Sequence, residues 1–151
     1  MRIVLLAALV FAAPAMAQED LRIDQSKIYV SDPKACDMLE KKGIDAFMDL
    51  DFVALGFPKG IQSMEFQCNF FDIKSREGSS HLFVDAVCEL PGEIYPDTLA
   101  IAPYSETQIQ VVSSSDAAMA AAGLFEPASE VAAPGATIYT RCDNLSEITV
   151  D

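Results

Sequence analysis

Four cysteines are the residues of this sequence with the most definite chemistry. They lie at Cys36, Cys68, Cys88 and Cys142, and no C-x-x-C spacing is present that would favour a metal site or thiol redox activity. An even number of cysteines in an exported chain is typical of a disulfide framework. The sequence therefore predicts two disulfides and no free nucleophilic thiol.

The pairing of these cysteines has three possible arrangements. Cys68 and Cys88 lie on two strands of one predicted hairpin, whose polar loop is centred near Glu77. With that centre Cys68 would not lie opposite Cys88, and a direct cross-strand bridge is geometrically demanding. We therefore expect the pairs Cys36–Cys68 and Cys88–Cys142.

One histidine and two carboxylates are the remaining candidates for catalysis. His81 lies at the edge of the polar loop, and Asp85 is too far along an extended strand to orient it by a hydrogen bond. Asp49 and Asp51 would point the same way from a regular strand, where they could bind calcium or act as an acid–base pair. A charged strand face exposed to solvent, or a strand edge protected against aggregation, is the more ordinary explanation.

No motif for a nucleophile elbow, a phosphate-binding loop, a dinucleotide-binding loop or a calcium loop occurs in the chain. The sequence therefore predicts no catalytic residue, no metal site and no cofactor. Four aromatic residues at strand ends, turns or outer faces are candidates for contact with a partner, although they could also cover a second layer of the core. These residues are Phe71, Phe83, Tyr95 and Tyr104.

The first 17 residues have the layout of a secretory signal peptide. Arg2 is followed by the apolar run Ile3–Ala13, and Ala15 and Ala17 form an A-x-A cleavage pattern. The run is too short to cross a bilayer, which takes about 20 residues, and no later stretch is long enough. We expect cleavage to leave residues 18–151 as a single domain without a membrane span, located in the periplasm or secreted.

The chain is strongly acidic, with a formal net charge of −13. Removing Arg2 with the leader makes the charge one unit more negative, because the leader contains no acidic residue. Such a surface repels nucleic acid and anionic lipid, and it favours a cationic protein as partner. Solubility alone would also account for it.

The elements that must position these residues are mostly strands. A helix is predicted over residues 32–43, with Asp32 and Pro33 at its start and Gly43 at its end. Five to seven short strands follow, separated by turn residues. Residues 114–136 are rich in Ala, Ser, Pro and Gly and predict a long surface excursion, with a short helix over 116–124. We expect a mainly β fold, at the margin of α+β: a small antiparallel sandwich or barrel with one N-terminal helix and two disulfides.

In size, leader, acidity and disulfide content the chain resembles small exported β-proteins of Gram-negative bacteria, including periplasmic lysozyme inhibitors. The signature segments of those inhibitors do not match this chain residue by residue, and nothing lines up with their serine-bearing inhibitory loop, so the resemblance carries over no functional residue. The sequence favours an exported binding or inhibitory module that is not an enzyme and has a protein partner. The alternatives are a structural accessory protein of the envelope, and a small hydrolase using Asp49, Asp51 or His81. The oligomeric state is left open.

Overall fold

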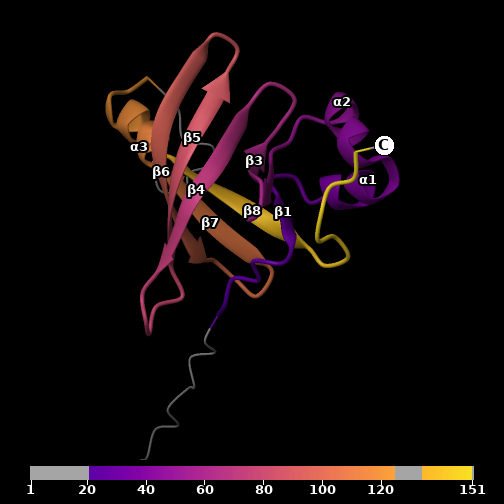
Figure 1. The fold of residues 1–151 in the computed structure, drawn as a ribbon, viewed down its shortest axis with the longest axis horizontal. Helices are drawn as coiled ribbons and strands as arrows, with labels where there is room; N and C mark the ends of the chain where they lie inside the picture. Colours follow the sequence, from indigo (N-terminus) through magenta and orange to yellow (C-terminus); the bar gives the residue numbers. More distant parts are fainter. Residues whose placement is uncertain (1–20, 125–133, 151) are drawn as a thin grey trace, which may run out of the picture.

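Strands that are neighbours in the sequence are also neighbours in space, and they close into an antiparallel barrel (Figure 1). The computed structural model describes residues 21–124 and 134–150, so the predicted signal peptide at residues 1–17 lies outside the described residues. The eighth strand pairs with the first, which closes the barrel. The predicted fold class is therefore confirmed, as a barrel with two disulfides. The elements are β1 (Ile28–Val30), α1 (Ala35–Lys42), η1 (Gly43–Asp45), α2 (Ala46–Asp49), β2 (Ala54–Gly56), β3 (Gly60–Gln62), β4 (Gln67–Ser75), β5 (Leu82–Leu90), β6 (Glu93–Pro103), β7 (Gln108–Ser113), α3 (Ser114–Ala121) and β8 (Ala136–Cys142).

Two separate cores stabilise the molecule. The barrel core lies inside the barrel and includes Tyr29, Leu99 and Tyr139, all at most 4% exposed. The helix core lies outside the barrel, where α1 and α2 pack on β1 and β2, and it includes Leu39 and Phe47. This separation follows from strand alternation, because neighbouring residues of β1 point to opposite faces of the sheet and enter different cores.

The alternation of apolar and polar residues from Phe47 onward predicts a strand, but its first residues are helical and only its last part is a strand. Residues Ala46–Asp49 form α2, and the next strand, β2, begins only at Ala54. The ring of Phe47 stacks on that of Phe52 with 4.5 Å between their centroids, and both rings are buried in the helix core. Tertiary burial of these aromatic residues thus overrides the alternating pattern of the sequence.

Residues 98–102, which lie between Pro96 and Pro103, predict a short strand, and the strand observed there is longer. β6 begins at Glu93 and continues through Pro96, which pairs with Val87 of β5. β7 pairs with β6 only from Leu99 onward. At Pro96, β6 therefore has no neighbouring strand of the described chain on that edge, and no backbone N–H is needed there as a hydrogen-bond donor. A proline is therefore tolerated within this strand.

The two disulfides are Cys36–Cys142 and Cys68–Cys88, so the predicted pairing is wrong. Cys68 lies directly opposite Cys88 on β4 and β5, with 3.9 Å between their Cα atoms. The hairpin is centred further along the chain than predicted, since Lys74 pairs with Phe83. A register shift between residues 70 and 72 then brings the two cysteines opposite each other.

The other bridge joins Cys36 on α1 to the last residue of β8 and borders the helix core. It ties α1 to the outside of the barrel, close to where β8 pairs with β1.

Within residues 21–124 and 134–150, no helix combines the length and the apolar character that a bilayer crossing requires.

Candidate functional site

A cavity of about 300 Å³ opens at the end of the barrel next to α3. Its walls are side chains that point into the barrel, including Ile61, Leu99 and Val111, and Leu90 and Met119 lie at its edge. Polar side chains also line it, among them the carboxylates of Asp97 and Asp116 and the hydroxyl of Tyr139. This volume lies at the lower end of the roughly 300–1,000 Å³ of typical ligand pockets, which are likewise mostly apolar with a few polar groups. We call this space the mouth cavity.

Asp97 is a carboxylate at an inward-facing position of β6. Residues 97, 99 and 101 share one face of the strand, and the other two are Leu99 and Ile101 of the barrel core. Asp97 is only 7% exposed, and burying a carboxylate is costly unless it receives hydrogen bonds. It must therefore be satisfied by groups close to it.

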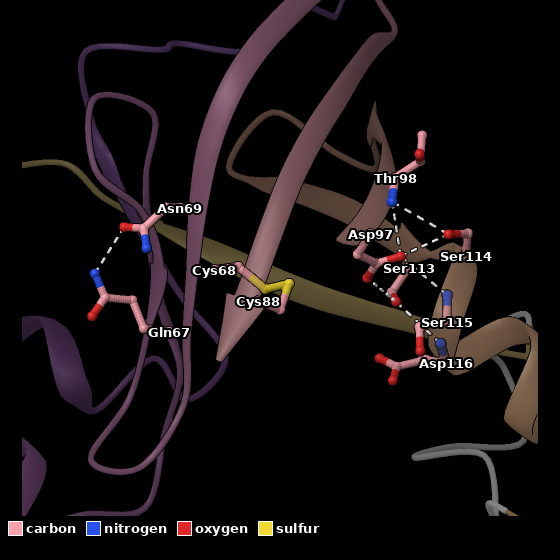
Figure 2. Close-up of a disulfide and its surroundings, with 10 residues drawn as sticks. All are labelled: Gln67, Cys68, Asn69, Cys88, Asp97, Thr98, Ser113, Ser114, Ser115 and Asp116. Atoms are coloured by element: carbon pink, nitrogen blue, oxygen red, sulfur yellow. Dashed lines mark hydrogen bonds between the residues drawn. A yellow bond between two sulfur atoms is a disulfide. The ribbon is translucent and has the colours of Figure 1, made fainter. Parts of the chain in front are cut away.

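The start of α3 supplies most of those groups (Figure 2). The hydroxyls of Ser113 and Ser114 donate to the Asp97 carboxylate at 2.5 and 2.6 Å. The backbone N–H groups of Thr98 and Ser115 donate to it at 2.8 and 3.1 Å. Because the N-terminal end of a helix carries a partial positive charge, α3 and Asp97 stabilise each other. Asp97 is thus the anchor that holds α3 beside the mouth of the barrel.

α3 begins two residues earlier than the predicted helix at 116–124 and ends at Ala121. Ser113 caps it, because its side chain accepts a hydrogen bond from the N–H of Asp116 at 3.1 Å. Gly135, with a φ of +74°, lies directly against the first turn, where a Cβ atom would collide with the backbone of Ala117. A glycine is therefore needed at this position for α3 to lie close to the start of β8.

Asp116 lines the mouth cavity, and no residue of the described chain donates a hydrogen bond to its side chain. In a reciprocal capping box an acid three residues after the cap would accept a bond from the N–H of Ser113. That N–H donates instead to the carbonyl of Gly135 at 3.2 Å. In Figure 2 the Asp116 side chain points away from the start of α3, and among the described residues none donates to its carboxylate. Burial first, and the nearby charge of Asp97 second, raise the pKa of Asp116 above its usual 3.8.

The two tyrosines of the barrel core differ in how their hydroxyls are satisfied. The Tyr29 hydroxyl donates to the carbonyl of Asp24 at 3.1 Å and accepts from its N–H at 3.0 Å. Tyr139 is equally buried, at 4% exposure, yet no residue of the described chain hydrogen-bonds its hydroxyl. Among the described residues, every fully buried side-chain oxygen has a hydrogen-bond partner. Because the Tyr139 hydroxyl has none, its oxygen is not fully buried and is reachable from the cavity that the residue lines.

The charge of Asp116 acts on the aromatic residues around it. Burial first, and then Asp116, raise the pKa of Tyr139. The same two causes, with smaller effects from Asp97 and Glu93, raise the pKa of Tyr95, which also lines the cavity. Both phenols therefore stay neutral over the physiological range and can donate or accept hydrogen bonds.

A shallower hollow of about 370 Å³ adjoins the mouth cavity and shares Phe66 and Leu90 with it. Met64, 60% exposed, lies in this hollow together with the acidic residues Glu65 and Glu89. We call it the groove. The mouth cavity and the groove thus adjoin each other, and together they present apolar contact surface and negative charge.

The structure does not bring the four predicted contact residues together. Tyr95 lines the mouth cavity. Phe71 and Phe83 are exposed on β4 and β5, and Tyr104 is exposed just after β6, and none of these three lines the mouth cavity or the groove. Of the disulfide cysteines, Cys68 lines the cavity, so its bridge to Cys88 forms part of the wall.

The candidate catalytic residues lie on different elements. Asp49 belongs to α2 and forms an ion pair of 2.7 Å with Lys42, so the predicted strand face shared with Asp51 is wrong. His81 is exposed just before β5, with its Nδ1 at 3.3 Å from the hydroxyl of Ser79. Across residues 21–124 and 134–150, no group of three or more His, Cys, Asp or Glu residues is arranged to hold a metal ion.

The sequence-based reasoning missed Asp97, Asp116 and Tyr139 as site residues. Two signals for the acids are visible in the sequence. Asp97 is followed at alternate positions of the strand by two apolar residues, so it is predicted to share their face. The run from Ser113 to Asp116 fits a capping box. For Tyr139 the sequence offers no signal, because its missing partner is apparent only in three dimensions.

No match is found when the chain is compared with protein-family models, with curated proteins or with solved structures. The inference of function therefore begins from the geometry of the mouth cavity and the groove.

Proposed function

We propose that this chain is an exported, non-enzymatic binding module, and that it binds a cationic protein partner at the mouth cavity and the groove. The observation that carries the proposal is that a mostly apolar cavity and a shallow acidic groove adjoin each other, with Phe66 and Leu90 lining both. A peptide segment needs a groove for its backbone, and one anchoring side chain in a pocket supplies much of the binding energy. The shape of the site thus fits a protein partner better than a single small molecule.

Charge supports a cationic partner. The whole chain has a net charge of −13, and the site itself contains Glu65 and Glu89 in the groove and Asp116 in the cavity. Complementary charge raises the rate of association and disfavours acidic competitors. Binding that depends on this attraction must weaken as salt is added.

Export is supported by the two disulfides together with the leader-like first 17 residues. Disulfides persist in oxidising compartments such as the bacterial periplasm and the extracellular space. The non-enzymatic part of the proposal draws support from the dispersal of His81, Asp49 and Asp51 over different elements. A general base needs a partner within hydrogen-bonding distance to orient it, and these three residues do not supply one another with such a partner.

The test uses a basic peptide of alternating Lys and Ala residues, titrated into the ¹⁵N-labelled protein. We expect amide shift changes at Phe66, Leu90 and Met119, and an affinity that falls as sodium chloride is raised. Met64→Lys places a positive charge in the groove and should weaken binding by about tenfold. Phe83→Lys makes the same change of charge at a similarly exposed site on the barrel wall, and we expect an effect within about twofold.

Equal weakening by both lysine variants would mean that only net charge matters, and the proposed site would be wrong. Shift changes confined to the outer faces of β4 and β5 would also overturn it. Thermal unfolding of each variant serves as the control for folding, since both substitutions replace exposed side chains.

A further inference from the structure

We infer that the mouth cavity binds an alkylammonium group, with the carboxylate of Asp116 and the hydroxyl of Tyr139 as its hydrogen-bond acceptors. This inference rests on the proposed function in that it assigns the anchoring group for the same site. It names the chemistry of the ligand, which the acidic character of the surface alone does not specify.

The walls of the cavity fit an aliphatic stem. Ile61, Leu99 and Val111 form apolar walls inside the barrel, and the apolar residues Leu90 and Met119 lie at the edge. An aliphatic chain gains binding free energy with each CH₂ group that it buries, and long amine side chains bury their stems along such surfaces. The cavity therefore has room and chemistry for a chain of several carbons that ends in a polar head.

The two carboxylates of the cavity have different roles. Asp97 accepts four hydrogen bonds from the chain itself, which are enough to satisfy a carboxylate in a partly buried position. Asp116 accepts none from the described residues and lines the cavity. The negative charge of Asp116 is therefore the one that remains for a ligand to pair with.

Tyr139 supplies an independent indication of a ligand. Its side chain is more than nine-tenths buried, yet its hydroxyl has no partner in the described chain, whereas the hydroxyl of Tyr29, the other tyrosine of the barrel core, has two bonds to Asp24. A buried polar group is ordinarily satisfied, and a cavity that leaves one open is suited to a ligand with hydrogen-bond donors. An ammonium group carries three donors and no acceptor, which matches a carboxylate and a hydroxyl that can both accept.

An anionic or neutral head group fits this site less well. A carboxylate ligand would meet the charges of Asp97 and Asp116 in a space of low polarity, where like charges repel strongly. A neutral alcohol would leave Asp116 without a counter-charge. An alkylammonium group can come from two sources, the lysine side chain of a protein partner and a free alkylamine, and both present the same chemistry to the cavity.

The experiment compares ligands that differ only in their head group. n-Hexylammonium, n-hexanol and n-hexanoate are titrated separately into the labelled full-length protein, and the shift changes of cavity-lining amides are measured. In parallel, three peptides of otherwise identical sequence present Lys, Arg or norleucine at their central position. We expect the order hexylammonium, hexanol, hexanoate, and the order Lys, Arg, norleucine, from the tightest to the weakest binding.

Variants of the protein test the two acceptors. Asp116→Asn should weaken hexylammonium binding by about tenfold or more, because it removes a charge-assisted hydrogen bond, and should leave hexanol binding within about twofold. Asp51→Asn removes the same charge at an exposed site beyond α2, and we expect it to change neither affinity by more than about twofold. Tyr139→Phe keeps the shape of the buried ring and should weaken hexylammonium binding by about threefold.

Hexanol binding as tightly as hexylammonium, or an equal loss with Asp116→Asn and Asp51→Asn, would overturn the assignment of the cavity to an alkylammonium group. Tighter binding of the Arg peptide than of the Lys peptide would overturn it as well. The proposed function fails separately, if no peptide perturbs the cavity or the groove while hexylammonium still binds. In that outcome the free amine is the source of the group and the protein partner is excluded.

Discussion

The two sides of the barrel are built in opposite ways. On the side of β1 and β2 the strands are three residues long, and α1 and α2 cover them with the helix core, which the Cys36–Cys142 bridge borders (Figure 1). On the side of β4, β5 and β6 the strands are 9 to 11 residues long and surround the barrel core, which ends in the mouth cavity. α3 lies at this second side, away from α1 and α2, and a carboxylate anchors it.

Under the proposed function, this difference separates the part of the fold that supplies stability from the part that binds. The helix-covered side is held by apolar burial and a bridge that closes a long loop, neither of which leaves a polar group open. The mouth side has a shorter disulfide loop, a polar anchor and two side chains without partners in the described chain, Asp116 and Tyr139. Both groups line the mouth cavity, so under the proposed function they are available to a ligand.

The largest effect is expected from the removal of each disulfide by paired Cys→Ala substitution, which tests this comparison. Cys36 and Cys142 are 106 residues apart and Cys68 and Cys88 are 20 apart. The chain-entropy relation gives losses of about 5 and about 3 kcal/mol in the free energy of unfolding. Denaturant unfolding measures both. A greater loss from removing the shorter loop would show that the mouth side, and not the helix-covered side, limits the stability of the fold.

A second test truncates one leucine side chain in each core. Leu39→Ala in the helix core should cost about 3 kcal/mol, because it leaves a void closed off from water. Leu99→Ala enlarges the mouth cavity, which is already open to solvent, and should cost about 2 kcal/mol. Chemical denaturation of the two variants and the parent protein gives the difference, and the reverse order would contradict the proposed asymmetry.

The anchoring of α3 is tested with Asp97→Ala. Loss of the charge-assisted hydrogen bonds to Asp97 should cost about 2 kcal/mol and should loosen α3. Hydrogen exchange of the amides of Ala118 and Ala120 should then accelerate, while that of Leu39 in α1 should change only by the global loss of stability. Unchanged relative protection of α3 would mean that the close approach of Gly135 is sufficient to hold it.

The smallest expected effect is the response of stability to pH at Asp116. Burial and Asp97 raise the pKa of this group in the folded state, so the folded protein binds a proton more readily than the unfolded chain. Its contribution to stability is therefore greatest below the unfolded value of 3.8 and is lost as the pH rises through the raised folded pKa. Asp116→Asn should stabilise the protein slightly at pH 7 and have no such advantage below pH 3.8, as measured by thermal unfolding at both pH values. A destabilised Asp116→Asn protein at pH 7 would show that the carboxylate has a structural partner.

Several features of the molecule follow from local sequence. Gly43 ends α1 with a positive φ, as its position after two lysines predicts. The alternation in β4 and β5 and the polar loop between them identify a hairpin, because strand periodicity and turn residues are properties of short segments. The even number of cysteines similarly predicts two bridges.

The closure of the barrel, the pairing of the cysteines and the mouth cavity depended instead on contacts between distant residues. The irregularity between residues 70 and 72 decides that Cys68 lies opposite Cys88, and α2 forms where an alternating sequence predicts a strand because Phe47 packs against Phe52. The diversion of the Ser113 N–H to Gly135 leaves the Asp116 carboxylate open, and only the folded chain brings these three residues together. By itself the sequence determined which residues alternate, cap and turn, since those are properties of neighbours along the chain. Which polar groups remain unsatisfied was decided by the tertiary structure, because a hydrogen bond is either made or missing only after distant segments have packed.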